Sequence, residues 1–232
     1  MLHPFRGCRP GAGYGLDCDS MHPLALRAIF RMDQVRFALF RARYRRSLRV
    51  EAPASPNLRF THLRLEPDAR FEVGPGFATE RQPGNRIWVQ MGGRLELDRD
   101  VWLRTEYGPN WITVFEGARI RLGARALING AMLHSKGEIA IGEDSMVGFG
   151  SRIIDADLHD IDSENRERIE PIHIGDRVWI ASDVQVLRGV RIGDDVVVGA
   201  GSVVTGDLPP QVLAVGAPAR VVRELASRVG CR

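Results

Sequence analysis

The sequence predicts an all-β chain built as a parallel β-helix, preceded by one helix and followed by a short second helix. Two observations carry this prediction. β-branched residues recur every six positions, and apolar-Gly pairs such as Ile141-Gly142 recur at coil-length intervals. A third observation separates the N-terminal segment from the rest: residues 1–49 hold ten Arg against three Asp, whereas the remaining residues hold 22 basic against 26 acidic residues.

The six-residue repeat is clearest in the second half of the chain. Counting in sixes gives nine positions that are all Ile or Val, namely Ile141, Val147, Ile153, Ile174, Ile180, Val186, Ile192, Val198 and Val204. Six residues make one short strand plus a corner, and three such units close a triangular coil of about 18 residues. The β-branched residue is expected to point inward and to stack on its equivalent one coil away, with parallel ladder hydrogen bonds between coils.

The coil boundaries divide the chain into four parts. Coils are expected to start at Ile141, Ile174 and Ile192, with earlier starts at Leu122, Leu97 and Val73, so that the β-helix spans residues 61–208. The interval from Ile141 to Ile174 is one coil plus 15 residues, which predicts a loop at residues 159–173 that leaves the coil. Residues 209–232 form a C-terminal arm, in which prolines stop the repeat and residues 219–229 are expected to be helical.

The N-terminal segment is expected to be an unstructured lead (1–20), then a basic amphipathic helix and linker (21–60). The helix is predicted from about residue 20 to residue 48, with an apolar stripe of Leu24, Ala28, Met32, Val35 and Leu39 among many arginines. Two interpretations stay open. The helix packs on the main domain with a solvated Arg face, or it lies on an anionic membrane surface. Residues 50–60 are interpreted as the linker.

Composition excludes several classes of protein. The chain has 232 residues and is 44% hydrophobic, so it can bury a core. No apolar run of 18 residues and no signal-peptide pattern is present, which favours the cytoplasm. Cys8, Cys18 and Cys231 lie near the termini, which argues against a structural zinc, a disulfide framework or a nucleophilic cysteine in the central domain. Few aromatic residues accompany the arginines, so nucleic acid is not expected as a partner.

Residues 174–224 carry an ordered set of motifs: a coil start, Trp179, GAGSVVT at 199–205 and GAPA at 216–219. The set extends back through IIDADLHDID at 153–162, which includes His159. This region resembles the left-handed β-helix acyltransferases with hexapeptide repeats, most closely the sugar, capsule or lipopolysaccharide O-acetyltransferases. The resemblance implies a homotrimer that binds acetyl-CoA in grooves between neighbouring prisms. It also implies a saccharide, or a nucleotide- or lipid-linked sugar, as the acceptor.

The resemblance assigns His159 as the general base that takes the proton of the acceptor hydroxyl. An imidazole suits this role because its ordinary pKa, about 6.5, lies close to neutral pH. Asp157 and Asp155 precede this histidine, and either carboxylate could orient the ring or bind an acceptor hydroxyl. Counting in sixes places Asp157 on an inward position that holds Ser or Val in other repeats. No cysteine in the domain is available to carry the acyl group, which favours direct transfer within a ternary complex.

Further candidates line the two substrate positions. Asn129, His134 and Trp179 are expected near the acceptor, and Trp179 is also expected to form a wall of the donor groove. The acyl donor is expected to contact the backbone N–H groups of Ala181 and Ser182, together with Ala200, Gly201, Arg220 and Arg223. Two departures from relatives concern this groove. Ala181-Ser182 stands where relatives often have Gly-Gly, and Gly206 stands where they often have Lys.

Two other functions are compatible with this pattern. The chain could be a non-catalytic β-helix that acts as a scaffold or ligand-sensing subunit. A metalloenzyme similar to the γ-class carbonic anhydrases would need three histidines at one metal. The sequence offers His134, His159 and His173 without a closely spaced pair, so no metal is expected.

Overall fold

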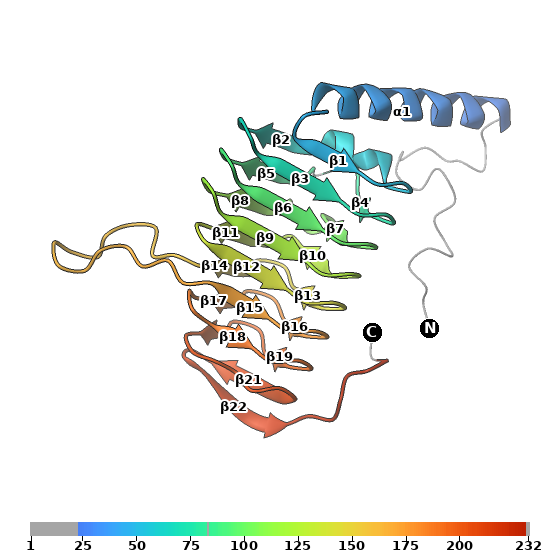
Figure 1. Ribbon diagram of the computed structural model, residues 1–232. Coiled ribbons are helices and arrows are strands. Elements are labelled where there is room, and N and C mark those ends of the chain that lie inside the picture. Colours follow the sequence, from blue (N-terminus) through green and yellow to red (C-terminus); the bar gives the residue numbers. More distant parts are fainter. Residues whose placement is uncertain (1–22, 83, 231–232) are drawn as a thin grey trace.

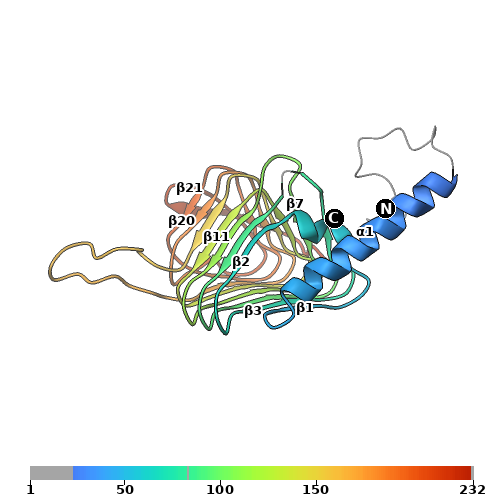
Figure 2. The same cartoon turned by 90° about the horizontal axis from the view of Figure 1, so that it is seen from above.

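The computed structural model describes residues 23–82 and 84–230, with side chains described from residue 31 onward. The predicted fold class is confirmed: strands wind as a parallel β-helix that is triangular when seen along its axis (Figure 2). Helix α1 (Pro23–Arg43) lies across the N-terminal end of this prism (Figure 1). The β-branched residues turn inward, as the six-residue repeat predicts, and most of them are fully buried.

Three sheets form the sides of the prism. Side 1 contains β1 (Leu48–Val50), β3 (Arg70–Val73), β6 (Arg94–Leu97), β9 (Arg119–Leu122), β12 (Glu138–Ile141), β15 (Ile172–Ile174) and β18 (Arg191–Ile192). Side 2 contains β4 (Ala78–Thr79), β7 (Trp102–Arg104), β10 (Leu127–Asn129), β13 (Met146–Val147), β16 (Trp179–Ile180), β19 (Val197–Val198), β21 (Val212–Gly216) and β22 (Ala219–Glu224). Side 3 contains β2 (His62–Leu65), β5 (Arg86–Val89), β8 (Trp111–Val114), β11 (Met132–Ser135), β14 (Arg152–Ile154), β17 (Gln185–Val186) and β20 (Val203–Val204).

The strand register confirms the predicted coil starts. On side 1 they pair in one continuous row, Val73, Leu97, Leu122, Ile141, Ile174 and Ile192. Each of these side chains is at most 4% exposed, so the row is an inward stack. Full burial of such a side chain stabilises the fold by about 1.5–3 kcal/mol. The stack therefore fixes the register of the whole prism.

Inward serines fasten one coil to the next where the repeat has a small residue. Ser145 Oγ donates to Gly175 O at 2.8 Å and accepts from Val178 N at 2.9 Å. Ser151 makes the same two bonds with Ala181 O and Val184 N, at 2.8 and 3.1 Å. These hydroxyls satisfy backbone groups that the corners leave without ladder partners.

Both ends of the predicted β-helix need correction. The helix ends at Arg43 rather than near residue 48, and β1 pairs with β3, so residues 48–60 are not a linker. They form the first coil, which includes β1 and the 3-10 helix η2 (Pro56–Phe60). The C-terminal helix predicted over residues 219–229 is also wrong, because β22 pairs antiparallel with β21 and covers its otherwise open edge. The predicted lead at 1–20 lies outside the described residues.

Helix α1 packs on the prism through aromatic residues and not through the described part of its apolar stripe. Phe37 is buried against the core and Phe40 and Tyr44 pack beside it, whereas Met32, Val35 and Leu39 are exposed. The helix therefore packs on the main domain, as the first interpretation expects, but with another face. Aromatic residues on the opposite helix face pack against the prism instead, because they can bury more apolar area.

The coil opens between β14 and β15. Residues 155–171 leave the prism as the long projecting loop in Figure 1, which agrees with the predicted excursion within a few residues. An antiparallel bridge between Ala156 and Ile169 closes its base. In the part of the chain that the structure describes, no helix has the length and apolar character needed to cross a membrane.

Candidate functional site

A strip of small residues runs along side 2, beside the corner with side 3. The ladder places Asn129, Gly148, Ala181 and Gly199 in successive coils, followed by Val215 and its antiparallel partner Arg220. Five ladder steps at about 4.8 Å each make this strip roughly 24 Å long. Gly148 lies close to the next coil, because a Cβ at this position would come within 2.7 Å of the backbone of Ala181. The strip is therefore a row of mostly small residues that ends at an arginine.

Trp179 borders this strip on side 2. Its row contains Met146, Val197 and Leu213 and ends at Arg223, so the two predicted arginines finish neighbouring rows at the same end of the prism. Trp179 is 43% exposed, so its ring offers an uncovered apolar face. Trp179, Ala181, Arg220 and Arg223 therefore share one surface, as the predicted donor groove requires.

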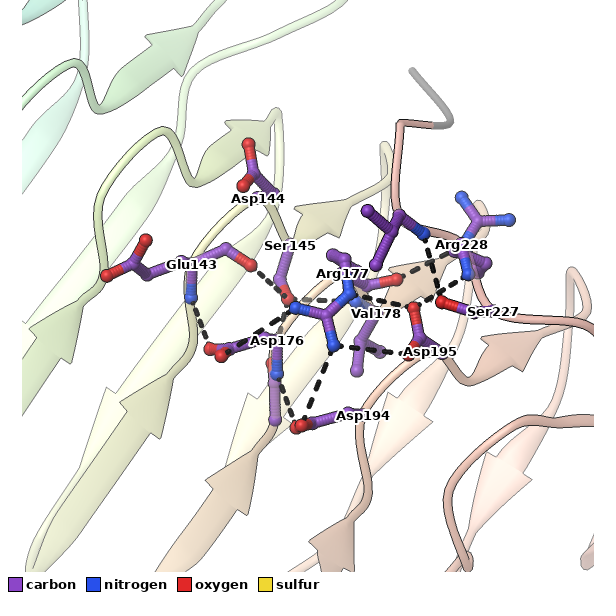
Figure 3. Close-up of polar contacts among 12 residues, drawn as sticks. Glu143, Asp144, Ser145, Asp176, Arg177, Val178, Asp194, Asp195, Ser227 and Arg228 are labelled. Carbon is purple, nitrogen blue, oxygen red and sulfur yellow. Dashed lines mark hydrogen bonds and ion pairs between the residues drawn. The ribbon is translucent and has the colours of Figure 1, made fainter.

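The C-terminal tail brings an arginine that sequence reasoning missed. Arg228 lies with its guanidinium carbon 5.8 Å from the centroid of the Trp179 ring. Figure 3 shows how the tail is held: Arg228 N donates to Asp195 Oδ1 at 2.9 Å, and Arg228 Nε donates to Arg177 O at 3.1 Å. The helix predicted over residues 219–229 gave no reason to expect this contact, because a helix would not bring Arg228 back to Arg177 and Asp195.

An ion pair beneath the tail makes this attachment firm. Asp195 is buried, and Arg177 Nε donates to its Oδ1 at 2.8 Å. The hydrogen bond from Arg177 holds the pKa of Asp195 below its usual value, with a further lowering by the Arg228 N–H. The tail is thus fastened to a carboxylate that stays ionised across the physiological range.

The two backbone donors predicted at the corner are not equivalent. Ala181 N donates to Val198 O at 3.0 Å as part of the ladder, so the donor role predicted for this group is wrong. Ser182 lies at the corner itself and is exposed, and among the described residues no partner takes its N–H. Ala200 and Gly201 occupy the same corner one coil further, where Gly201 adopts φ 70°. Ala181 therefore remains a lining residue, and Ser182 keeps the predicted donor role.

Asn129 has an acceptor atom without a partner. Its Oδ1 is buried, and no hydrogen bond reaches it in the described chain. A buried acceptor of this kind needs an explanation, and a ligand or a water is the usual one. Its place at the upstream end of the strip makes it a candidate ligand contact of the groove.

The second group of predicted residues lies at the base of the projecting loop, between sides 3 and 1. Asp155 is fully buried and accepts from Ser135 Oγ at 2.7 Å, Lys136 N at 2.8 Å and Gly137 N at 3.0 Å. These bonds tie the start of the loop to the preceding coil. Asp155, and not Asp157, therefore occupies the inward position, because counting in sixes fails once the chain leaves the coil.

Asp157 is committed to an arginine. Arg188 Nε donates to its Oδ1 at 2.7 Å, and this contact is the largest cause of its lowered pKa. Arg168 N donates to the other oxygen at 3.2 Å. Neither Asp155 nor Asp157 is hydrogen-bonded to His159 in the described chain, so the structure does not show the predicted Asp–His contact.

His159 lies on the outgoing arm of the loop and is exposed. The preceding residue, Leu158, has φ 69°, an uncommon conformation for a leucine that turns the chain sharply at this point. Asp160 follows, and its pKa is lowered first by the Glu167 N–H, then by Arg166 and also by the charge of His159. His159 therefore lies exposed on the projecting loop, with the Asp160 carboxylate next to it.

His134 lies on side 3 near the base of the same loop, since Asp155 N donates to His134 O at 3.4 Å. Burial lowers the pKa of His134, and its buried Nε2 has no partner among the described residues. The edge of its ring faces Phe115 with centroids 6.3 Å apart. A neutral imidazole with a free nitrogen can serve as a hydrogen-bonding group toward a ligand.

The structure therefore brings the predicted residues together in two groups rather than one. Trp179, Ala181, Ser182, Ala200, Gly201, Arg220 and Arg223 share side 2 and its corner with side 3, and Asn129 joins them. His134, Asp155, Asp157 and His159 share the corner between sides 3 and 1. The strands of side 3 separate the two groups, which therefore do not meet within one chain.

No metal centre is found in residues 23–82 and 84–230, where no three His, Cys, Asp or Glu side chains converge. His134 lies on side 3, His159 on the loop and His173 on side 1, so the three histidines of the carbonic-anhydrase alternative are dispersed. A groove of about 990 Å³ on side 1 is lined by charged residues that include Glu72, Glu96 and Arg121. It contains none of the predicted site residues other than His173 of that alternative.

Residues 171–206 match the family described as bacterial transferase hexapeptide (six repeats). Galactoside O-acetyltransferase of Escherichia coli (strain K12) is 57% identical over 58 residues, which are 25% of this chain and 29% of that protein. The C-terminal half of the prism therefore contains a segment similar to the hexapeptide-repeat transferases. It matches less than a third of the length of that curated relative.

Solved structures resemble this chain over more of its length. A mutant of AntD, an N-acyltransferase from Bacillus cereus solved with dTDP and coenzyme A, covers 68% of this chain and 85% of its own, with 15% identity and a TM-score of 0.50. That similarity supports the left-handed β-helix and nothing further. A hexapeptide-repeat acetyltransferase of Vibrio cholerae, solved with acetyl-CoA, is 28% identical, covers 66% of this chain and 72% of its own, and has a TM-score of 0.46.

Proposed function

We propose that the chain is an acetyl-CoA-dependent O-acetyltransferase that acts on a saccharide hydroxyl in the synthesis of a cell-surface polysaccharide. One observation carries the proposal: the strip of small residues that leads from Asn129 past Ala181 to Arg220. A thin, extended acyl-pantetheine chain suits such a track, and arginines at its end suit the phosphates of the donor. The name of the Escherichia coli relative, a galactoside O-acetyltransferase, supports an acetyl donor and a sugar acceptor.

Three arginines support a phosphate-binding end. Arg220 and Arg223 are exposed on β22, and Arg228 adds a third guanidinium beside Trp179. Neither Arg220 nor Arg223 forms an ion pair with an acidic side chain of the described residues, so both keep their charge available. A guanidinium can make two parallel hydrogen bonds to one phosphate group. Together they offer the positive charge that Gly206 does not supply.

The reaction is direct transfer. The acceptor oxygen attacks the thioester carbonyl while His159 takes the hydroxyl proton, so that a C–O ester bond forms and the C–S bond breaks. The imidazolium then returns the proton to the departing CoA thiolate. Proton transfer by a positioned side chain contributes about 10²–10⁴-fold to such a reaction. An amino-sugar acceptor would use the same base for N-acylation.

The active assembly is a homotrimer of parallel prisms. The separation of the two residue groups supports this part of the proposal, because His159 points away from the strip of its own chain. A neighbouring prism would bring its side 2 against the loop of the first and complete the site. Asp157, held by Arg188, then serves as a positioning residue for the loop rather than as the partner of the imidazole. We place this assembly in the cytoplasm, at the inner face of the membrane.

The decisive experiment compares wild type with His159→Ala. Acetyl transfer from acetyl-CoA to a panel of galactosides and oligosaccharides should fall by about 10²–10⁴-fold. CoA binding, followed by calorimetry with dephospho-CoA as a control, should be unchanged, because His159 lies on the loop and not on side 2. Equal transfer by both proteins would remove His159 as the base. Wild type that binds no acetyl-CoA at millimolar ligand would instead favour the scaffold or ligand-sensing function.

A further inference from the structure

Helix α1 has two different faces. Its inward face carries Phe37, which is buried, with Phe40 and Tyr44 packed beside it. Asp33 is buried on the same face and its carboxylate pairs with Arg59 of η2. These contacts account for the attachment of the helix to the prism, and in the described part of the chain the opposite face stays exposed.

The outward face is apolar. Met32, Val35 and Leu39 lie one helical turn apart, and they are 52%, 60% and 67% exposed. Figure 1 shows the helix lying across the end of the prism, so this face looks away from the stacked coils. Contiguous exposed apolar side chains of this kind mark an interaction surface.

Arginines border the apolar stripe. Residues 31–49 contain seven Arg and one acidic residue, Asp33. Beside Leu39 lies a hollow of about 430 Å³, lined by Arg36, Arg43, Arg59 and Arg81 with the rings of Phe40 and Phe60. Arg59 and Arg81 lie over the Phe60 ring, with guanidinium carbons 4.3 and 4.8 Å from its centroid. No acidic side chain lines this hollow, so its charge is strongly positive.

The crowding of like charges is visible in one group. Burial lowers the pKa of Arg59, and the neighbouring charges of Arg81 and Arg36 lower it further, although Asp33 opposes them. An anion in the hollow would relieve this repulsion. A tetrahedral phosphate fits best, because several guanidinium groups can donate to its oxygens at once.

We propose that the outward face of α1, together with this arginine hollow, docks on a bilayer that contains anionic phospholipid. The apolar stripe enters the boundary between headgroups and acyl chains, and the hollow takes a headgroup phosphate. A helix with an apolar face and an Arg-rich border binds such interfaces by exactly these two contributions acting together. The prism axis then stands away from the membrane, with the N-terminal coil nearest to it.

The proposed trimer would strengthen this attachment. Three parallel prisms present three such helices at the same end, and linked weak sites bind far more tightly than one. This consequence rests on the proposed function, but docking by a single chain does not. Membrane attachment would keep the site close to a lipid-linked acceptor.

Flotation of the full chain with vesicles tests the proposal, using phosphatidylcholine alone and phosphatidylcholine with 30% phosphatidylglycerol, in about 0.1 M salt. We expect at least tenfold stronger binding to the anionic vesicles. Val35→Ser/Leu39→Ser and Arg36→Gln/Arg43→Gln should each weaken that binding by tenfold or more. Arg70→Gln/Arg94→Gln removes two exposed arginines from side 1 and should stay within twofold of wild type.

Several outcomes would overturn the proposal. Equal flotation of wild type and the Val35→Ser/Leu39→Ser variant with anionic vesicles would indicate non-specific charge attraction. An equal loss of flotation by the Arg70→Gln/Arg94→Gln control would indicate the same. Sedimentation without lipid tests whether a second copy of the chain covers this face instead. If wild type self-associates, the Val35→Ser/Leu39→Ser variant does not, and neither protein floats with vesicles, the face binds a second copy. Since flotation needs no acetyl donor, a protein that floats but transfers no acetyl group would remove the proposed function alone.

Discussion

Two corners of the prism meet the same backbone requirement with different side chains. At the corner between sides 1 and 2, left-handed φ values of 55–60° fall on Asp100, Arg125, Asp144, Arg177 and Asp195. At the corner between sides 2 and 3, they fall mostly on glycines, namely Gly130, Gly150 and Gly201, with Asp183 as the charged exception. Glycine adopts this conformation without a steric penalty, whereas Asp and Arg do so at a cost.

The charged corner compensates for that cost with contacts between coils. The Arg125 guanidinium donates hydrogen bonds to the Asp144 carboxylate at 2.6 and 2.8 Å. Two coils further along, Arg177 donates to the Asp195 carboxylate in the same way. The signs of the charges alternate along the corner, and Figure 3 shows the Arg177–Asp195 pair among them. Among the described residues the glycine corner forms no such pairs, and it leaves Phe149 exposed beside it. One corner therefore stabilises the stack, and the other leaves room for a ligand.

Filling the glycine corner should give the largest effect. Ala181→Phe places a ring in the strip, and overpacking of about 1–3 kcal/mol corresponds to roughly 5- to 150-fold weaker CoA binding. The thermal midpoint should not change, because the side chain at this position points outward. Calorimetry with CoA and differential scanning measure the two quantities.

Arg125→Met is the matched change at the charged corner. It should lower the thermal midpoint by a few degrees while CoA binding stays at the wild-type value. If Ala181→Phe binds CoA as wild type does, the strip is not the donor groove and the contrast between the corners has no functional meaning.

Asp195→Ala should lower the free energy of unfolding by about 1–3 kcal/mol, since it leaves Arg177 and the Arg228 N–H without their shared acceptor. The folded-state pKa of Asp195 is lowered, so its contribution is complete above the unfolded value of about 3.9 and is lost as the pH falls through the folded value. Urea unfolding at pH 7 and near pH 3 should show this gap closing on acidification. Asp98→Ala, an exposed carboxylate of the same corner, should show almost no gap at either pH.

The regular part of the fold was predictable because one physical rule governs it. An inward β-branched residue every sixth position has a single stacked solution, so the row from Val73 to Ile192 could be placed from sequence. The same rule fails where the chain leaves the coil, which is why Asp155 takes the inward position that counting assigned to Asp157. Counting cannot detect the bonds from Ser135 and the Lys136 N–H that draw Asp155 inward.

The ends of the chain resisted prediction for another reason. Helix α1 has apolar residues on two faces, and the stripe with the better periodicity is the exposed one, since the aromatic residues make the contact. The tail after β22 depends on one buried carboxylate, Asp195, far away in sequence. The residues of the site were recognised through motifs, but their division between two corners follows from the winding of the coils.

Gly206→Lys should give the smallest effect on CoA affinity. It tests whether an added positive charge at the arginine end of the strip strengthens phosphate binding. A Cβ at this position meets no atom within 4 Å, so the change should leave stability unaffected. If the donor phosphates lie nearby, one added surface charge should tighten CoA binding by about two- to fivefold, or up to about 1 kcal/mol. Gly206→Ala is the control, and the gain should shrink with dephospho-CoA if the lysine reaches the 3′-phosphate. Unchanged CoA binding by Gly206→Lys would place the phosphates elsewhere and leave Arg220, Arg223 and Arg228 as the groups to test next.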